Sequence, residues 1–485
     1  MKFLKDILYK CRLKEVLGST NVAVEHIASD SRLVKPFTVF VAVRGTVTDG
    51  HNYIASAIEK GAVAVVCEEL PEERPDTVTF VQVDEAAKSL GYIASNFYDN
   101  PSEEVKVVGI TGTNGKTTCA TLLYQLFRLL NQPTGLLSTV VNRINDQQIE
   151  ATHTTPDAIS LNALLRKMAD KGIEYCFMEA SSHAIHQHRV TGIQFAGGVF
   201  TNITHDHLDY HGTFNEYIKA KKGLFDMLPS SAFALVNNDD LHSEVMVQNC
   251  KAKVRTFGLK TMTDYRVKVL ENQFTGLHLN LDGKDLYTKL VGGFNAYNLL
   301  AVYAVSMELG MDQMDVLTSM SMLGSVEGRF QYVESKEGII GIVDYAHTPD
   351  ALLNVLKTIK DIRTGNEQVI TVVGCGGDRD KDKRPKMATI AAELSERVIL
   401  TSDNPRTEDP EAILNDMKQG LDPAQTSRTF SITDRREAIR MACSIAKKGD
   451  ILLVAGKGHE KYQEVNGVRS PFDDMQILKE TLNAG

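Results

Sequence analysis

The residues whose types most clearly suggest chemistry lie in "VVGITGTNGKTTCATLL", Val107 to Leu123. A strand-like apolar run precedes its glycines, and an apolar helix pattern follows them. Such a turn lets backbone N–H groups and a helix N-terminus contact phosphate oxygens. Lys116 can then reach the β- and γ-phosphates, and the Thr117 hydroxyl can bind Mg²⁺. The general pattern G-x-x-x-x-G-K-[ST] fails by one place, since Gly109 stands one position too far from Gly115. We still predict that the loop binds a nucleoside triphosphate.

Acidic and histidine side chains gather farther along the chain. Glu179 follows the apolar run "YCFM", where a strand-end carboxylate beside a phosphate loop could bind Mg²⁺. Six of the thirteen histidines fall between His183 and His211. The segment "THDHLDYHG" is close to the H-x-H-x-D-H cluster of zinc metallohydrolases, except for the interposed Tyr210. A zinc hydrolase is therefore an alternative hypothesis, with these candidate ligands: His205, Asp206, His207, Asp209 and His211.

Short apolar runs typical of strands alternate with helical patterns, and this alternation predicts parallel sheets with ligands at the carboxyl ends of their strands. The runs are "TVFVAV" (Thr38–Val43), "AVAVVC" (Ala62–Cys67), "VTFVQV" (Val78–Val83), "VKVVGI" (Val105–Ile110), "YCFM" (Tyr175–Met178), "GVFTNI" (Gly198–Ile203), "FALV" (Phe233–Val236), "VITVV" (Val369–Val373), "RVILT" (Arg397–Thr401) and "ILLVA" (Ile451–Ala455).

A chain of 485 residues is too long for one hydrophobic core and predicts about three domains. Polar breaks occur at "NFYDNPSEE" (Asn96–Glu104) and "GSVEGRF" (Gly324–Phe330). We predict an α/β protein with a smaller N-terminal α/β domain (1–100), a central P-loop-type ATPase domain with a parallel sheet (101–327), and a C-terminal Rossmann-like α/β domain (328–485).

Composition narrows the class of protein. The net charge of −9 argues against nucleic acid as a partner. Seven scattered cysteines without a C-x-x-C pair fit reduced thiols in a cytoplasm. The N-terminus lacks a signal-peptide core, and no apolar run approaches the ~20 residues that cross a bilayer. We expect a soluble cytoplasmic protein without membrane insertion, and take a monomer as the working hypothesis.

The strings "GITGTNGKTT", "MEASSH", "THDHLDYHG" and "EYIKAKKGLF" together resemble the central domain of the Mur ligases, ATP-dependent enzymes that build the stem peptide of cell-wall peptidoglycan. The resemblance implies that Glu179 and His207 bind Mg²⁺ with Thr117, and that CO₂ carbamylates Lys221. A carbamate would make this lysine an anion that can orient metal ions. Without the resemblance, Lys219, Lys221 and Lys222 have the pattern of a solvated helix face. The implied ATP-binding loop comprises Gly112, Thr113, Asn114, Gly115, Lys116, Thr117 and Thr118.

The resemblance runs nearly end to end and extends to the nucleoside. In "GGFNAYNLLAVYA" it implies that Asn298 meets the adenine, in "EGRF" that Arg329 meets the phosphates, and in "DYAHTPDAL" that Asp344 meets the ribose. The implied reaction transfers the γ-phosphoryl of ATP to a carboxylate, and an amine then attacks the acyl phosphate. Lys116 would stabilise the charge that develops on the transferred phosphoryl group.

"GCGGDRDKDKRP" and "SDNPRTEDP" resemble the members that add the third residue of the stem peptide. The D-N-P-R string implies meso-diaminopimelate as the incoming amino acid, because lysine-adding relatives lack the arginine. An arginine fork can bind the far carboxylate of diaminopimelate bidentately, whereas lysine has no such group. The implied diaminopimelate site comprises Arg379, Asp403, Asn404, Pro405, Arg406, Gly456 and Glu460.

The implied acceptor is UDP-N-acetylmuramoyl-L-alanyl-D-glutamate. By resemblance, the UDP and muramoyl-dipeptide contacts come from Ser29, Ser31, Thr46, Val47, Thr48, Thr154, Thr155, Ser181, Gln187 and Arg189. A lysine-adding sister enzyme stays open as an alternative, and folylpolyglutamate synthetase is more remote. From other classes, the zinc metallohydrolase and a non-catalytic nucleotide-binding module are the alternatives.

Overall fold

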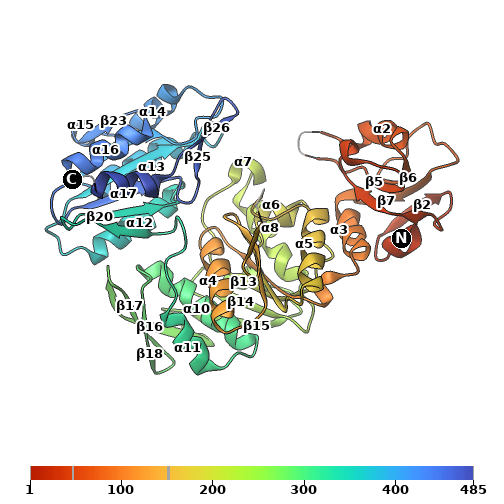
Figure 1. Ribbon diagram of the computed structural model, residues 1–485, viewed down its shortest axis with the longest axis horizontal. Helices are drawn as coiled ribbons and strands as arrows, with labels where there is room; N and C mark the ends of the chain where they lie inside the picture. The colour runs from red at the N-terminus through yellow and green to blue at the C-terminus, as the bar shows by residue number, and fades with distance from the viewer. Residues whose placement is uncertain (1, 46–47, 150–152, 484–485) are drawn as a thin grey trace. The chain divides into compact units, whose positions relative to one another are not determined.

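The computed structural model describes residues 2–45, 48–149 and 153–483 (Figure 1). The contacts between Cα atoms divide the chain into two compact units. The first contains Met1–Gly112, Leu123–Asn202 and Asn215–Thr256, and the second contains Thr113–Leu122, Ile203–Phe214 and Phe257–Gly485. Each of the three predicted sequence ranges has its own strands and helices, and the exact bounds of the domains stay predictions.

The N-terminal sheet lies in the first unit. Its strand order is β2 (Leu13–Leu17), β7 (Thr79–Val83), β6 (Ala62–Cys67), β5 (Thr38–Val41) and β4 (His26–Ala28). All neighbours are parallel except the edge strand β2. Side chains alternate along β5. Val39 and Val41 join a core with α1 (Leu4–Ile7) and α3 (Ala86–Phe97), whereas Phe40 joins a core with α2 (Ile54–Glu59). The sheet is therefore covered on both faces.

The phosphate-loop strand β8 is the middle of a larger sheet in the first unit. Parallel neighbours run in the order β9 (Thr134–Leu137), β12 (Tyr175–Glu179), β8 (Lys106–Thr111), β13 (Phe195–Phe200) and β14 (Phe233–Asn237). The antiparallel strands β10 (Asn142–Ile144) and β11 (Gln147–Ile149) extend the β9 side. Parallel pairing in register brings the carboxyl ends of β8 and β12 to the same edge.

The second unit contains an antiparallel meander that the sequence analysis did not identify. It consists of β16 (Tyr265–Gln273), β17 (Gly276–Leu281) and β18 (Lys284–Thr288), beside α10 (Gly293–Glu308) and α11 (Gln313–Ser321). Asp282 and Gly283 both have positive φ, 48° and 85°. An Asp-Gly pair in this conformation favours a two-residue hairpin turn. The prediction of parallel sheets holds for the strands that precede the site loops, and the meander and the sheet edges add antiparallel strands to it.

The C-terminal sheet has the order β19 (Gln331–Glu334), β20 (Ile340–Asp344), β24 (Ile451–Ala455), β21 (Val369–Cys375), β22 (Arg397–Ser402) and β23 (Thr429–Ser431). Only the edge strand β19 is antiparallel. One face packs on α12 (Pro349–Ile362), α13 (Lys383–Leu394) and α14 (Pro410–Lys418), and the other on α16 (Arg435–Ile445) and α17 (Asp474–Asn483). This doubly wound sheet gathers the loops after β20, β21, β22 and β24 at one edge.

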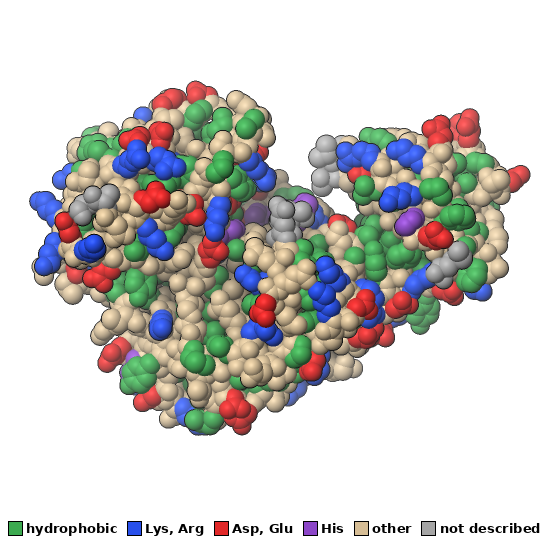
Figure 2. Space-filling view, in the orientation of Figure 1, with side chains coloured by type: hydrophobic (Ala, Val, Ile, Leu, Met, Phe, Trp, Pro, Cys, Tyr) green, Lys and Arg blue, Asp and Glu red, His purple; other side chains and the backbone are tan. Residues whose placement is uncertain are grey.

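The surface drawn in Figure 2 carries Lys and Arg side chains interspersed with Asp and Glu. None of the helices among the described residues combines the length and hydropathy that a bilayer crossing requires.

Candidate active site

The glycines of the phosphate loop meet a steric requirement. The loop connects β8 to α4 (Lys116–Leu129). A Cβ atom on Gly112 would stand 1.9 Å from Thr201 Oγ1 and 3.1 Å from Asn202 O, so a larger residue would require a shift of these residues, which follow β13. Gly115 has a φ of 88°, a conformation that glycine adopts without strain. The backbone can therefore make the tight turn that a phosphate-binding loop needs.

In the second unit, the rest of the loop contacts residues from the C-terminal part of the chain. Lys116 Nζ donates to Thr113 O at 3.0 Å. Arg329 Nη2 donates to Thr117 Oγ1 at 3.0 Å. Asn114 Nδ2 donates to Asp350 Oδ2 at 2.8 Å. The structure thus brings the predicted phosphate ligands Lys116, Thr117 and Arg329 together.

Asp350 is a residue of this loop environment that the sequence analysis missed. It lies at the start of α12, in "HTPDAL", and its Oδ2 also accepts from Thr204 Oγ1 at 3.1 Å. The sequence did offer a signal for Asp350, because it lies in "DYAHTPDAL", the segment after a strand in which Asp344 had already been identified.

Asp344 is held at the end of β20, where the resemblance places the ribose. Its Oδ2 accepts from the Phe330 backbone N–H at 2.6 Å. Burial raises the pKa of Asp344 to about 6, although the Arg329 charge and two backbone N–H groups oppose the shift. Asn298 is buried in α10, where its Nδ2 donates to Asn295 Oδ1 at 3.0 Å and its Oδ1 lies 3.5 Å from Cys119 Sγ. Asn298 therefore lies against the same helix, α4, that begins at Lys116.

If the ionised Asp344 accepts ribose hydroxyls, the KM for ATP should rise as the pH falls through about 6. A raised pKa means that the folded carboxyl takes up its proton earlier than an ordinary Asp does. At one unit below its pKa only about a tenth is ionised, so we expect a rise of about tenfold between pH 7.5 and pH 5. The measurement is KM for ATP against pH, for the parent and for Asp344→Asn. The exposed Asp361→Asn should keep the rise and Asp344→Asn should lose it; a rise that persists in Asp344→Asn would contradict this role.

Glu179 organises the other group of predicted residues, which lies in the first unit at the end of β12. Glu179 is 1% exposed, and its Oε1 accepts from the Thr139 backbone N–H at 2.7 Å. Its backbone carbonyl accepts from Thr155 Oγ1 at 2.7 Å. Ser181 caps α6 (Ser182–His186) and lies 3.4 Å from Thr155 Oγ1. A buried carboxylate with polar neighbours is a suitable donor for a hard cation.

The predicted muramoyl-dipeptide residues are part of the same group. Arg189 Nη1 donates to Thr155 O at 3.0 Å, and its Nη2 donates to Gln187 Oε1 at 2.7 Å. Thr154 Oγ1 accepts from Thr139 Oγ1 at 3.1 Å. Thr154, Thr155, Ser181, Gln187 and Arg189, which the sequence spreads over thirty-six positions, are thereby linked by hydrogen bonds.

Lys221 does not lie on a solvated face, as its sequence pattern alone would indicate. It lies in α8 (Phe214–Asp226) and is 1% exposed, whereas the Lys219 side chain is 69% exposed. Its Nζ donates to Gly112 O at 2.7 Å and lies 4.5 Å from the Tyr217 ring centroid. A buried lysine that contacts the phosphate-loop backbone is in a position to act on that loop.

The zinc hypothesis receives no support from the geometry. In the parts of the chain that the structure describes, no three His, Cys, Asp or Glu side chains are placed to hold a metal ion. The ring of His205 stacks on Phe214, with centroids 4.5 Å apart. His207 Nε2 lies 3.4 Å from Asp206 Oδ2. Burial raises the pKa of Asp206, but His207, His347 and Lys116 lower it by more, so this carboxyl is an anion near the phosphate loop.

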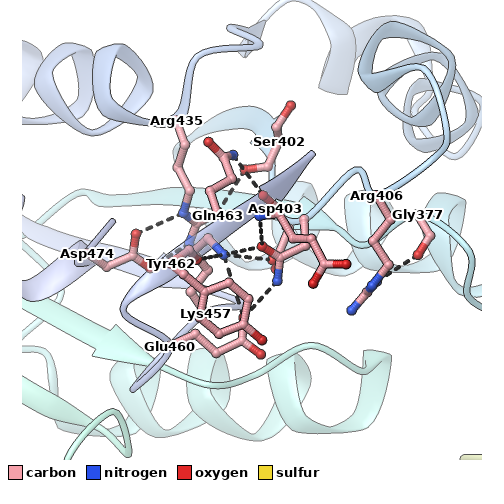
Figure 3. A network of polar contacts seen from close by, with 12 residues as sticks. Gly377, Ser402, Asp403, Arg406, Arg435, Lys457, Glu460, Tyr462, Gln463 and Asp474 are labelled. Carbon is pink, nitrogen blue, oxygen red and sulfur yellow. Dashed lines mark hydrogen bonds and ion pairs between the residues drawn. The ribbon is translucent and has the colours of Figure 1, made fainter. Parts of the chain in front are cut away.

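The D-N-P-R string forms the loop after β22 and meets the loops after β21 and β24 (Figure 3). Arg406 has a φ of 52°, and its Nη1 donates to Gly377 O at 2.7 Å. A Cβ on Gly377 would stand 1.9 Å from Pro405 O, and a Cβ on Gly456 would stand 2.6 Å from Asp403 Oδ2. Two glycines therefore permit the close approach of three loops.

Predicted residues from these loops contact one another. Asn404 Nδ2 donates to Glu460 Oε2 at 2.8 Å. Burial, reinforced by the Asp403 charge, raises the pKa of Glu460. Arg379, in the loop after β21, is exposed. The structure thus assembles Asp403, Asn404, Arg406, Gly456 and Glu460 at one sheet edge.

Two buried arginines that the sequence analysis missed support these loops. Arg384, which is completely buried, donates to both carboxylate oxygens of Glu408, at 2.8 and 3.0 Å, and this pairing lowers the pKa of Glu408 to about 2. Arg435 forms an ion pair with Asp474 at 2.7 Å, and its Nη2 also donates to Ala455 O at 3.0 Å. In the sequence, Arg384 and Arg435 appear as charged residues followed by helical patterns, and this arrangement does not indicate that they are buried.

The candidate UDP residues of the N-terminal domain lie around β4 and β5. Ser29 and Thr48 are exposed, and Ser31 is 8% exposed with its carbonyl accepting from Lys60 Nζ at 3.0 Å. Thr46 and Val47 lie outside the described residues.

Comparisons with known proteins agree along the whole chain. The family models that match are the Mur ligase family catalytic domain at residues 23–98, the Mur ligase middle domain at 110–306, and the Mur ligase glutamate ligase domain at 328–458. The chain is 55% identical to the UDP-N-acetylmuramoyl-L-alanyl-D-glutamate–2,6-diaminopimelate ligase of Cytophaga hutchinsonii, with 99% of each chain covered.

The enzyme of the same name from Bacteroides thetaiotaomicron is 52% identical, with 99% of this chain and 100% of the relative covered. A solved structure of a UDP-N-acetylmuramoyl-L-alanyl-D-glutamate–2,6-diaminopimelate ligase is 34% identical, covers 100% of this chain and 99% of its own, and superimposes with a TM-score of 0.71. The chain therefore belongs to the Mur ligase family.

Proposed function

We propose that this protein is the ATP-dependent ligase that adds meso-diaminopimelate to UDP-N-acetylmuramoyl-L-alanyl-D-glutamate in peptidoglycan synthesis. The observation that carries the proposal is the loop after β22, where Asp403, Asn404 and Arg406 stand in the order that marks the diaminopimelate-adding enzymes. The contact of Asn404 with Glu460, 2.8 Å, joins this loop to the loop after β24. Relatives more than half identical over nearly the full chain carry the same name.

The phosphoryl step follows from the charges that the chain supplies. Lys116 and Arg329 would neutralise the phosphate oxygens, with Asp344 on the ribose and Asn298 near the adenine. Positioning and charge neutralisation are the main requirements of phosphoryl transfer. The product is an acyl phosphate of the acceptor's glutamyl carboxylate. The amine of diaminopimelate then attacks this carbonyl as the free base, an amide bond forms, and phosphate leaves.

Mg²⁺ would be held by the Thr117 hydroxyl, the Glu179 carboxylate, His207 and a carbamate on Lys221. Hydroxyl and carboxylate oxygens are the donors that Mg²⁺ prefers, and the buried Glu179 fits that preference. When bound, the ion supplies neutralisation of the charge on the transferred phosphoryl group. The carbamate forms when the neutral Lys221 amine attacks CO₂ and loses a proton.

The acceptor would be held by Ser29, Ser31 and Thr48 on its UDP part, and by the Glu179-linked group of Thr154, Thr155, Ser181, Gln187 and Arg189 on its peptide part. Thr46 and Val47 remain candidates by resemblance. The substrates are precursors of the cell wall made inside the cell, so we propose that the protein works in the cytoplasm. We also propose that it works as a monomer.

The test supplies the purified protein with the acceptor, ATP and either meso-diaminopimelate or L-lysine, and measures phosphate release. We expect kcat/KM for diaminopimelate to exceed that for lysine by at least about 1,000-fold, because lysine leaves Arg406 desolvated and unpaired. Comparable release with lysine would favour the lysine-adding sister. Turnover without ATP, or no ADP release with any amino acid, would overturn the ligase assignment.

A further inference from the structure

Lys457 is a buried lysine to which the ligase reaction described above assigns no role. It lies in "AGKGHE", two residues after β24, and its side chain has no exposed surface. Lysine is almost never fully buried unless its ammonium is paired, because a buried unpaired charge is very costly. The groups that pair with the Lys457 ammonium therefore indicate the role of this residue.

The ammonium of Lys457 is surrounded by acceptors from two segments, the loop after β22 and the residues that follow β24 (Figure 3). Nζ donates to Asn404 Oδ1 and to Tyr462 O, both at 2.7 Å. Asp403 Oδ1 lies 3.5 Å away and Glu460 Oε2 lies 3.6 Å away. An ammonium has three N–H donors and no acceptor. Two hydrogen bonds and two ion pairs therefore stabilise the buried charge of Lys457.

These contacts fix which way the Asn404 amide points. Its Oδ1 accepts from Lys457 and also from the Glu464 backbone N–H at 3.0 Å. A flipped amide would direct its NH₂ group at two donors. The Nδ2 end therefore has to face Glu460, to whose Oε2 it donates at 2.8 Å. Lys457, through Asn404, holds the Glu460 carboxylate in one orientation.

The charges of this group leave a negative excess. The carboxylates of Asp403 and Glu460 lie beside the single ammonium of Lys457. The nearby Arg435 is paired with its own carboxylate, Asp474, and both side chains are fully buried. Within this hydrogen-bonded group the two carboxylates outnumber the one ammonium, which suits a cationic group at Glu460. Arg406, on the neighbouring loop, suits an anionic group.

We propose that Lys457 is a positioning residue, which orients Asn404 and Glu460 so that the site selects the second amino group of the incoming amino acid. This inference rests on the proposed function and divides the recognition of diaminopimelate into two parts. Arg406 recognises the far carboxylate. The Lys457–Asn404–Glu460 chain recognises the ammonium on the same carbon.

The test compares three amino acids with the parent protein and with Lys457→Met. Diaminopimelate has both far groups, L-2-aminopimelate lacks the far amino group, and L-lysine lacks the far carboxylate. In the parent, kcat/KM should be highest for diaminopimelate. In Lys457→Met we expect the preference for diaminopimelate over 2-aminopimelate to fall at least about tenfold, since a buried hydrogen bond to a charged group accounts for about that factor. The preference over lysine should change less than about threefold, because Arg406 is intact.

Three variants serve as controls. Lys461→Met removes a nearby lysine whose side chain is 63% exposed, and it should keep both preferences. Lys457→Arg retains the positive charge and should restore part of the lost preference. If Lys457→Met does not fold, Lys457→Met with Asp403→Asn removes the unpaired carboxylate and still leaves Asn404 without the Lys457 donor, so the same loss of preference is expected.

An unchanged preference over 2-aminopimelate in the folded variant would overturn the proposal. An equal loss of activity with all three amino acids would also overturn it, because a purely structural residue would have that effect. No diaminopimelate-dependent phosphate release by the parent would instead refute the proposed function.

Discussion

Lys221→Ala should lower kcat by about 100- to 1,000-fold, the range observed when one charge-stabilising group is removed from an active site. Lys221 is 1% exposed and its Nζ contacts Gly112 O at 2.7 Å, so the loss occurs beside the phosphate loop. If the functional form is the carbamate, a small carboxylate that diffuses into the vacated space should partly replace it. The measurement is phosphate release by the variant with and without formate, acetate or propionate.

Lys219→Ala is the matched control, because Lys219 lies in the same helix and its exposed side chain pairs with Glu216 in the neighbouring turn. It should retain nearly full activity and should not respond to carboxylates. Full activity of Lys221→Ala would exclude the carbamate. A large loss without any rescue would point to the unmodified ammonium as the functional group.

Arg406→Ala should raise the KM for diaminopimelate about 100-fold, equivalent to about 2.8 kcal/mol, within the range for charge-assisted hydrogen bonds. The guanidinium is oriented by its contact with Gly377 O at 2.7 Å. If Arg406 binds the far carboxylate of the substrate as proposed, its removal leaves that carboxylate without a partner. The KM for ATP should change less than about twofold, because the nucleotide residues are elsewhere. Steady-state kinetics with each substrate varied in turn gives both values.

The exposed Arg440, which pairs with Glu437 inside α16, gives the control Arg440→Ala, for which both KM values should stay at parent levels. Lysine should gain relative to diaminopimelate in Arg406→Ala, since the group that rejects it is gone. An unchanged KM for diaminopimelate would remove Arg406 from the amino-acid site.

The sequence by itself determined the class of fold, the phosphate loop and the family. Apolar runs such as Ala62–Cys67 and Ile451–Ala455 became strands with the predicted bounds, because strands buried on both faces have no polar positions to confuse the pattern. The glycines around Lys116 predict the phosphate-binding turn from sequence alone, because consecutive residues form both the turn and its expected phosphate contacts. The meander at 265–288 was missed although its Asp-Gly turn was visible.

Only the tertiary structure decided which charged residues are buried. Lys219, Lys221 and Lys222 are equivalent in the sequence, yet only Lys221 is in contact with Gly112 O. Likewise, Lys457 acquires its partners from loops that follow β22 and β24, strands separated by about fifty residues. Burial and pairing of a charge depend on segments that are distant in sequence, and no local pattern of residues records which segments the sheet will bring together.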